Sequence, residues 1–333
     1  MNLHTHYLGF DLPHPIVPGA CPLANDLDAA RRLEDAGAPM LTMTSLFEEE
    51  IQREAMAAHA AVDAPKEQFA EALSYLPEPE AWTIGPEDYL DRVFKLKQHL
   101  SIPVVASLNG TSLGGWLKHA RAIEDAGADA LEVNLYRVAT EFNKPAREVE
   151  AEQIQIVEEL KNQTALPLAV KLSPFYTAVP NIAGHFAAAG AEAVVIFNRF
   201  YQPELDIEEL ELERRLTLSN SAELNLRLRW LAILSGQLQC DLGVTGGVHT
   251  IEDAVKAIMC GADACQVVSA LLIHGPQHLA TLSHGLSKWL DDHEYHSLDQ
   301  ARGSMNMTRS GQTHAYARAN YIHLLRSWKP DDA

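Results

Sequence analysis

Short apolar runs alternate with longer segments of helical periodicity along almost the whole chain. This alternation is typical of a parallel sheet whose strands are connected by helices. The predicted strands are Ile16–Pro18, Met40–Met43, Val104–Leu108, Ala130–Asn134, Leu168–Leu172, Ala193–Phe197, Asp241–Val244 and Ala264–Val267. These eight runs match the number of strands that a closed (β/α)8 barrel requires, so we predict this α/β fold.

The predicted helices share an ending in which a glycine and an alanine stand directly before the next strand. This ending occurs at Gly37, Gly127, Gly190 and Gly261. Glycine suits the left-handed position that closes a helix, so the repeated ending predicts a series of βα units. An open, doubly wound sheet would show the same alternation. No G-x-G-x-x-G pattern follows the first strand, however, which favours the barrel.

Two connections are too long to be simple turns. Residues Leu46 to Gly85 follow the second predicted strand, and residues Asn198 to Glu223 follow the sixth. In a barrel both connections lie at the C-terminal ends of the strands, where active sites form. They are therefore candidates for lids or substrate walls, and the alternative is that they are solvated insertions without function.

The end of the chain is expected to add helices to the barrel. We assign residues 1–290 to the barrel and residues 291–333 to a C-terminal helical extension packed on it. Apolar side chains in this extension are Tyr316, Ala319, Tyr321, Ile322, Leu324 and Leu325. They are available for packing or for a subunit contact, so a homodimer is one expectation.

Length, charge and cysteine content narrow the function classes. One barrel can accommodate all 333 residues, and the net charge of −19 argues against a nucleic-acid partner. The chain has no apolar run long enough for a membrane span, and its first residues lack signal-peptide features, so we expect a cytoplasmic protein without a membrane anchor. The four cysteines form no C-x-x-C pair, so no metal site is expected.

The strongest local signal for a ligand is the glycine-rich segment Gly243–Val248, which ends the seventh predicted strand and is followed by residues 261–269 through the eighth. Adjacent glycines let backbone N–H groups approach a phosphate, and this part of a barrel is its usual phosphate site. The pattern alone indicates a phosphate-bearing ligand. A tight turn without any ligand is the alternative.

Three polar residues end neighbouring strands. Lys171 follows an apolar segment that directs its ammonium into the barrel mouth, where it would stabilise negative charge on the N1 and O2 edge of a flavin. A Schiff-base role and an ion pair with Glu132 are the alternatives. Asn134 and Asn198 can read a planar heterocycle or a carboxylate, and loop capping is their alternative role.

Together these residues resemble the dihydroorotate dehydrogenases, which are FMN-dependent (β/α)8 barrels of pyrimidine biosynthesis that oxidise dihydroorotate to orotate. The most specific matches are Val170-Lys-Leu, Leu131-Glu-Val-Asn and Thr245-Gly-Gly-Val. The resemblance implies that FMN is held by Gly19, Ala20, Thr44, Asn134, Lys171, Thr245, Gly246, Gly247, Val268 and Ser269. It also implies that Asn134 and Asn198 face the substrate.

Three substrate-side features depart from the family pattern. Arg137 stands where the soluble class has its catalytic cysteine, and a guanidinium cannot act as that base. Met43 replaces a lysine that contacts flavin and substrate, and the substrate asparagine is missing, the nearest match being Ala72–Pro77. This asymmetry suggests a retained cofactor with a changed or lost substrate.

Substitute bases are Thr140, Tyr136 and Glu141 in the fourth loop and Cys21 after the first strand, while Arg137 is an alternative clamp for a carboxylate or phosphate. The leading hypothesis is an FMN-dependent oxidoreductase acting on a small carboxylated or heterocyclic molecule. The alternatives are a flavin-binding accessory subunit of a redox complex, which implies a redox partner protein, and a non-redox lyase or isomerase of a phosphorylated substrate that forms an imine at Lys171.

Overall fold

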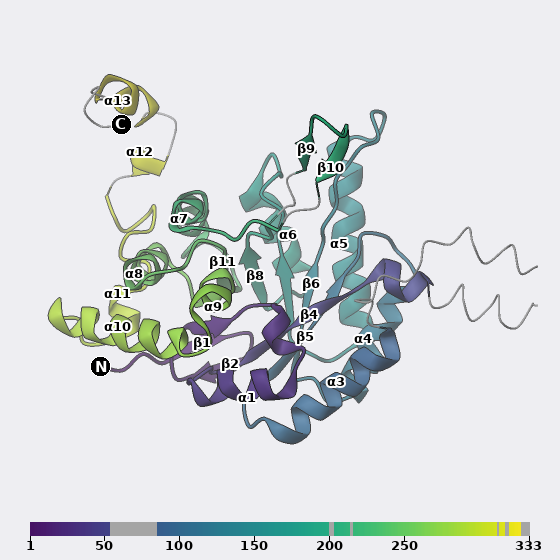
Figure 1. Ribbon diagram of the computed structural model, residues 1–333. Coiled ribbons are helices and arrows are strands. Elements are labelled where there is room, and N and C mark those ends of the chain that lie inside the picture. The colour runs from purple at the N-terminus through teal and green to yellow at the C-terminus, as the bar shows by residue number, and fades with distance from the viewer. Residues whose placement is uncertain (54–84, 200–202, 214–215, 312, 317–319, 328–333) are drawn as a thin grey trace, which may run out of the picture.

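Eight parallel strands form the centre of the molecule, a nearly closed barrel (Figure 1). The computed structural model describes residues 1–53, 85–199, 203–213, 216–311, 313–316 and 320–327. The barrel strands are β3 (Ile16–Pro18), β4 (Leu41–Phe47), β5 (Val104–Asn109), β6 (Ala130–Asn134), β7 (Leu168–Lys171), β8 (Ala193–Ile196), β11 (Asp241–Thr245) and β12 (Ala264–Val267). Their order, β3-β12-β11-β8-β7-β6-β5-β4, confirms the predicted (β/α)8 fold and all eight predicted strands.

Helices surround the strands and pack their apolar faces on the barrel (Figure 1). The outer helices are α1 (Leu27–Asp35), α3 (Pro86–His99), α4 (His119–Asp125), α5 (Ala146–Gln163), α6 (Val179–Ala188), α7 (Leu224–Leu234), α8 (Ile251–Cys260), α9 (Ser269–His274) and α10 (His278–Asp292). Short 3-10 turns occur at η1 (Pro22–Ala24), η3 (Gly115–Lys118) and η4 (Ser221–Glu223). No described helix has the length and apolarity needed to cross a membrane.

The glycine endings have the predicted conformation. Gly37, Gly127, Gly190 and Gly261 have φ angles of 91°, 97°, 104° and 115°. These left-handed angles favour glycine, which lets each helix stop and the chain turn at once into the next strand.

A small hairpin closes the N-terminal end of the barrel. It consists of β1 (Thr5–Tyr7) and β2 (Phe10–Leu12), and Tyr7, Leu8 and Leu12 pack on residues from the beginnings of the barrel strands. The Tyr7 hydroxyl lies 2.8 Å from where a Cβ on Gly243 would be, so a side chain at position 243 would clash with it. The hairpin therefore covers the interior of the barrel at its N-terminal end.

Both long connections leave the C-terminal ends of strands, as predicted. Residues 48–53 are helical, whereas most of the first connection, including Ala72–Pro77, lies outside the described residues. In the second connection β9 (Glu204–Asp206) and β10 (Glu211–Glu213) form a hairpin that rises above the barrel (Figure 1). The chain then returns to the barrel through η4 and α7.

The chain beyond α10 first packs on the barrel helices and then leaves them. After α11 (Leu298–Ala301), the backbone N–H groups of Gly303 and Met305 donate to carbonyls of α8. Figure 1 shows α12 (Thr313–Tyr316) and α13 (Asn320–Ser327) away from the barrel, and Tyr321 and Ile322 are exposed. Ala319 and the side chains of Leu324 and Leu325 lie outside the described part. We retain the boundary at residue 290 as a proposal.

Candidate functional site

A pocket of about 270 Å³ opens at the C-terminal end of the barrel. It is lined by residues that end or follow five strands, together with the chain segment that precedes η4. The lining consists of Ala20, Pro22, Lys171, Phe197, Asn198, Arg199, Leu216, Leu218, Ser219, Thr245, Gly246, Gly247, Val248, Gln266, Val268, Ser269 and Leu272. Eight of the predicted site residues therefore meet in one cavity, and the second long connection supplies part of its wall.

A buried carboxylate organises the polar floor of this pocket. Glu132 on β6 is 1% exposed, and its Oε1 accepts a hydrogen bond of 2.5 Å from the Lys171 ammonium. Its other oxygen accepts a bond of 2.7 Å from Nε2 of Gln266 on β12. Burying the three polar groups is tolerable because each charged group has a partner. The ion pair named as an alternative for Lys171 therefore exists, yet Lys171 also lines the cavity.

Gln266 is a site residue that the sequence reasoning did not name. Only 3% of the residue is exposed, and no described residue hydrogen-bonds its Oε1. Because a carboxylate can only accept, the amide nitrogen must face Glu132, and the carbonyl oxygen must point elsewhere. A glutamine inside the otherwise apolar run Ala264–Val267 was the available signal.

The glycine corner is packed from behind and open toward the pocket. Gly246 and Gly247 have φ angles of 84° and 92° and both line the cavity. A Cβ on Gly246 would lie 2.6 Å from an Arg227 guanidinium nitrogen, and one on Gly247 would lie 2.8 Å from Leu224 Cα. Packing alone thus requires glycine at both positions, which is the physical basis of the ligand-free alternative.

Arg227 places a cation behind this corner. The residue is 5% exposed, and its Nε donates to the Thr245 carbonyl while one terminal nitrogen donates to the Glu223 carbonyl at 2.6 Å. Burial lowers the pKa of Arg227, and no ion pair between it and a carboxylate occurs in the described ranges. A positive charge bonded to a peptide carbonyl polarises that peptide and strengthens the N–H on its far side. Here that N–H belongs to Gly246.

The pocket wall is joined to its floor at Ser219. Its backbone N–H donates to the Ser269 hydroxyl at 3.0 Å, and its own hydroxyl lies 3.0 Å from His249 Nε2. These bonds fix the segment that follows the β9–β10 hairpin against the beginning of α9. Ser269 therefore lies at the same end of the cavity as the glycine corner, where the family resemblance would place a phosphate.

Three predicted cofactor residues lie outside the pocket lining. The Gly19 N–H donates to the Val267 carbonyl at 3.0 Å, and the Thr44 hydroxyl donates to Asn25 Oδ1 at 2.5 Å. The Asn134 amide nitrogen donates to the Ser45 and Ser107 hydroxyls at 3.0 and 2.9 Å. These bonds connect the ends of β4, β5 and β6, so the observed role of the Asn134 nitrogen is to hold neighbouring strands together.

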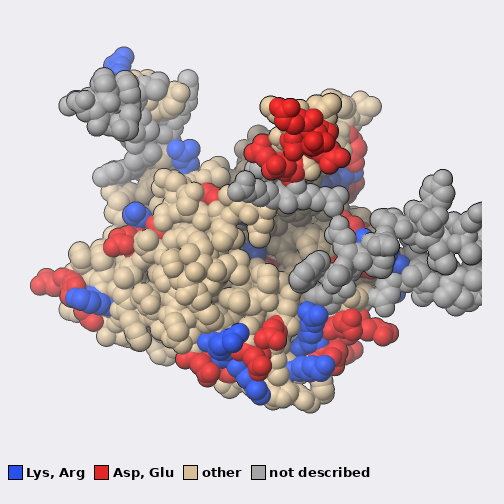
Figure 2. Space-filling view, in the orientation of Figure 1, with Lys and Arg blue, Asp and Glu red and all other residues tan. Residues whose placement is uncertain are grey.

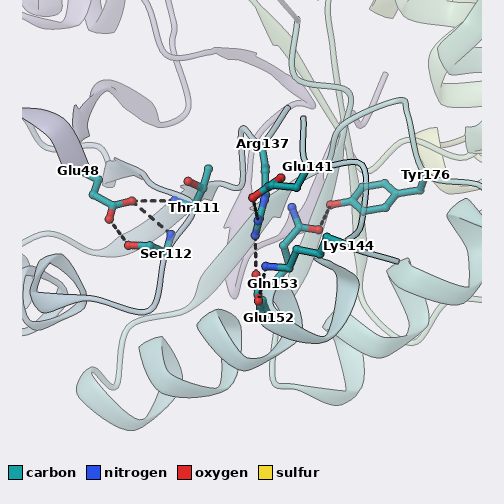
Figure 3. Close-up of polar contacts among 9 residues, drawn as sticks. All are labelled: Glu48, Thr111, Ser112, Arg137, Glu141, Lys144, Glu152, Gln153 and Tyr176. Carbon is teal, nitrogen blue, oxygen red and sulfur yellow. Dashed lines mark hydrogen bonds and ion pairs between the residues drawn. The ribbon is translucent and has the colours of Figure 1, made fainter. Parts of the chain in front are cut away.

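Arg137 lies in a separate ionic cluster (Figure 3). Its guanidinium donates to Glu152 on α5 at 2.6 Å and to Glu141 at 3.3 Å, and Lys144 donates to the other Glu152 oxygen at 2.5 Å. Side-chain hydrogen bonds from Lys144 and Arg137 lower the pKa of Glu152. These bonds attach the fourth loop to α5. Both terminal nitrogens of the Arg137 guanidinium, which could otherwise bind a substrate carboxylate or phosphate, already donate to protein carboxylates.

Two hollows of about 530 and 430 Å³ flank Arg137, and neither shares a lining residue with the first pocket. Glu48 lies beside the larger one, where its carboxylate accepts from the Thr111 N–H at 2.9 Å and from the Ser112 hydroxyl (Figure 3). Tyr136, Arg137, Thr140 and Glu141 all line this hollow. The structure thus separates the fourth-loop candidates from the pocket that contains Lys171.

Cys21 does not offer a ready base. The residue is 1% exposed, and burial raises the pKa of its thiol, which disfavours the thiolate. The described cysteines are all free, and the described residues contain no cluster of side chains able to hold a metal ion.

A sequence profile of the family described as dihydroorotate dehydrogenase matches residues 82–290, which is more than half of the chain. The chain belongs to the dihydroorotate dehydrogenase family. Family membership makes it an oxidoreductase of the dihydroorotate dehydrogenase type.

The named relatives are distant. Dihydroorotate dehydrogenase A (fumarate) from Lactobacillus delbrueckii subsp. bulgaricus is 26% identical over 285 residues, which cover 81% of this chain and 88% of the relative. Dihydroorotate dehydrogenase B (NAD(+)), catalytic subunit, from Thermoplasma acidophilum is 28% identical over 227 residues, covering 66% and 73%. At 26–28% identity the barrel fold is shared, while most individual side chains differ.

Proposed function

We propose that this member of the dihydroorotate dehydrogenase family is an FMN-dependent oxidoreductase whose flavin occupies the pocket above Lys171. The observation that carries the proposal is the composition of that single cavity. It brings together a buried ammonium, a buried amide oxygen without a described partner, and a corner of two glycines backed by a buried arginine. A planar, hydrogen-bonding ring with a phosphate tail matches all three features.

The chain's own groups divide the binding work. Lys171 would stabilise negative charge on the ring, while Gly246, Gly247 and Ser269 would hold the phosphate, with Thr245, Val268 and Ala20 completing the walls. Gly19, Thr44 and Asn134 remain proposed ring contacts from the family resemblance. FMN, when bound, supplies the redox chemistry by accepting a hydride equivalent. Asn198, at the rim of the same cavity, is the proposed substrate contact.

The substrate we propose is a small carboxylated or heterocyclic compound, either dihydroorotate or a related molecule. The cluster around Arg137 bears on this choice, because the position of the family's base is occupied by a guanidinium already bonded to Glu141 and Glu152. A substrate that loses its proton without that base, or another reductant of the flavin, accommodates this change.

The test combines a spectrum with an anaerobic titration. The purified protein should show a flavin spectrum and release FMN on denaturation, and an active dihydroorotate dehydrogenase should bleach when dihydroorotate is added without oxygen. A colourless protein that takes up no added FMN contradicts the cofactor assignment. A yellow protein that dihydroorotate leaves unbleached contradicts only that substrate.

A flavin-binding accessory subunit is the second candidate, and the ionic cluster at Arg137 favours it. Arg137→Cys separates the two functions, because it restores the family's base and removes one cation from Glu152. If dihydroorotate bleaches the variant and leaves the parent protein unchanged, the barrel retains the binding site and lacks only the base. A matching Met43→Lys change is unsuitable, since Met43 is fully buried in the apolar core and a lysine there would lack a partner.

Imine chemistry at Lys171 is disfavoured by its partner. The ion pair with Glu132 stabilises an ammonium, and an ammonium has no lone pair with which to attack a carbonyl. Treatment with substrate mixtures and borohydride should therefore add no mass at Lys171.

A further inference from the structure

We propose that the side-chain oxygen of Gln266 accepts a hydrogen bond from the imide N–H of the flavin ring, so that this glutamine selects for an unsubstituted pyrimidine edge. The inference rests on the proposed FMN function and adds a recognition residue to it. The Gln266 Oε1 atom is buried and has no hydrogen-bond partner among the described residues.

The orientation of Gln266 is set by chemistry. Its Nε2 donates to Glu132 Oε2 at 2.7 Å, and the reverse orientation would oppose two acceptors. The Oε1 therefore presents an acceptor, and an acceptor buried without a donor is destabilising unless a ligand supplies one. Gln266 lines the pocket, so a ligand in that pocket is the available source.

Gly19 packs closely against Gln266 and its neighbour Val268. A Cβ at position 19 would lie 3.5 Å from Gln266 Oε1 and 2.8 Å from Val268 Cγ2. Any larger residue at position 19 would displace Val268, which lines the pocket beside Gln266. The glycine thus preserves the pocket wall next to the acceptor.

Glu132 holds the Gln266 acceptor next to a donor, the Lys171 ammonium. The same carboxylate holds the Lys171 ammonium at 2.5 Å through its other oxygen, so Lys171 and Gln266 present a donor and an acceptor from one rigid anchor. The pyrimidine edge of an isoalloxazine carries a carbonyl acceptor directly beside an imide donor. The two patterns are complementary, which identifies the edge of the flavin that would face the floor of the pocket.

The experiment compares FMN with 3-methyl-FMN, whose imide nitrogen carries a methyl group and has no hydrogen to donate. Apoprotein is titrated with each flavin and binding is followed by fluorescence quenching. The parent protein should bind FMN about tenfold or more tightly than 3-methyl-FMN, since one hydrogen bond is lost and one buried acceptor is left unpaired. Equal affinities would overturn the proposal.

Gln266→Ala assigns the discrimination to this side chain. It removes the acceptor and makes room for the methyl group, so 3-methyl-FMN should bind this variant as well as FMN does or better. Because both flavins are compared on the same protein, any general weakening by the substitution cancels in the ratio. A preference for FMN unchanged from that of the parent protein would show that another group reads the imide.

Gln266→Met conserves the side-chain volume while removing the acceptor. It is the variant to use if Gln266→Ala does not fold. The expected result is a loss of FMN affinity of about tenfold. Gln153→Met is the matched control, because Gln153 is equally buried at 3% exposure but lies on α5 beside Tyr176. Unchanged FMN affinity in Gln266→Met contradicts the proposal, whereas failure of the parent protein to bind FMN contradicts the proposed function itself.

Discussion

At the scale of single residues, the carboxylates Glu132, which is buried, and Asp263, whose side chain is 20% exposed, differ in what compensates their charge. Glu132 faces the Lys171 ammonium at 2.5 Å. Asp263 accepts from the Leu242 N–H at 2.8 Å, and its nearest cation, the Arg302 Nε, is 3.4 Å away. A close partner stabilises a buried charge, whereas burial without one favours the protonated acid. The two residues therefore lead to different predictions.

Removing the negative charge of Glu132 should leave the Lys171 ammonium without a counter-ion. Glu132→Gln is expected to lower the free energy of unfolding by about 3–5 kcal/mol, because it leaves an uncompensated ammonium in the barrel. The double variant Glu132→Gln/Lys171→Met removes both charges and should recover a large part of that loss. Urea unfolding of the parent protein, both single variants and the double variant measures the coupling. Additive losses would contradict it.

Asp263 should make stability depend on pH. Burial raises its pKa to about 6, with Asp241 adding to the shift and Arg302 and His6 opposing it. The folded protein then holds a proton that the unfolded chain has released. Its contribution to stability is complete below pH 4 and is lost as the pH rises to about 6. Between pH 4 and pH 7 the parent protein should lose about 2 kcal/mol relative to Asp263→Asn. An equal difference between the two proteins at both pH values would contradict the shift.

At the scale of elements, the β11–α8 corner depends on how closely α7 approaches it. Gly247 lies against the backbone at the first residue of α7, so no side chain can be added without moving that helix. Arg227, one turn into α7, bonds the last carbonyl of β11. The corner, its backing cation and the helix therefore form one unit, and a change in any of them should reach the pocket.

Gly247→Ala tests this unit, with Gly275→Ala as the matched control. Both glycines have positive φ, at 92° and 81°, so both substitutions carry a backbone cost of about 1–3 kcal/mol. An alanine at 275 meets nothing within 4 Å, whereas one at 247 overlaps Leu224. Gly247→Ala should therefore cost about 1–3 kcal/mol more in thermal or urea unfolding and also weaken FMN binding. Equal costs and equal FMN affinity would show that the corner tolerates a side chain.

The sequence predicted the barrel well because the determinants of its strands and helix ends are local. An apolar run such as Ala193–Phe197, or a helix-ending glycine such as Gly261, can be recognised from the local sequence, without knowing which distant segments lie beside it. Contacts between distant segments are different. Nothing near Arg227 in sequence shows that its helix lies behind the glycine corner, and Arg137 gives no local sign that Glu152 neutralises it. The site was therefore predicted as a set of residues whose mutual geometry required the structure.

At the scale of the whole molecule, six of the carboxylates behind the net charge of −19 lie on the β9–β10 hairpin, which precedes part of the wall of the proposed flavin pocket. Figure 2 shows acidic side chains gathered on the β9–β10 hairpin, whose sequence from Glu204 to Glu213 contains six carboxylates and no basic residue. Leu216, Leu218 and Ser219, which follow the hairpin in sequence, line the pocket. A field of one sign beside a site steers small ions according to their charge and weakens with salt.

Electron transfer out of the reduced protein should therefore depend on the charge of the acceptor. Cationic hexaammineruthenium(III) should reoxidise the flavin several-fold faster at low than at high ionic strength, and anionic ferricyanide should show the opposite trend. Replacing Glu204, Glu208 and Glu211 by glutamine should reduce both salt effects. Stopped-flow absorbance of the flavin band measures these rates.

A second triple variant separates a local field from total charge. Asp35 and Asp125 end α1 and α4, and Glu294 follows the C-cap of α10. Replacing these three residues by amides changes the net charge equally but leaves the hairpin intact. Since interactions between exposed charges fade beyond about 8–10 Å at moderate salt, this control should retain the parental salt dependence. If both triple variants behave alike, acceptors respond to the charge of the whole molecule and the hairpin has no special part in steering them.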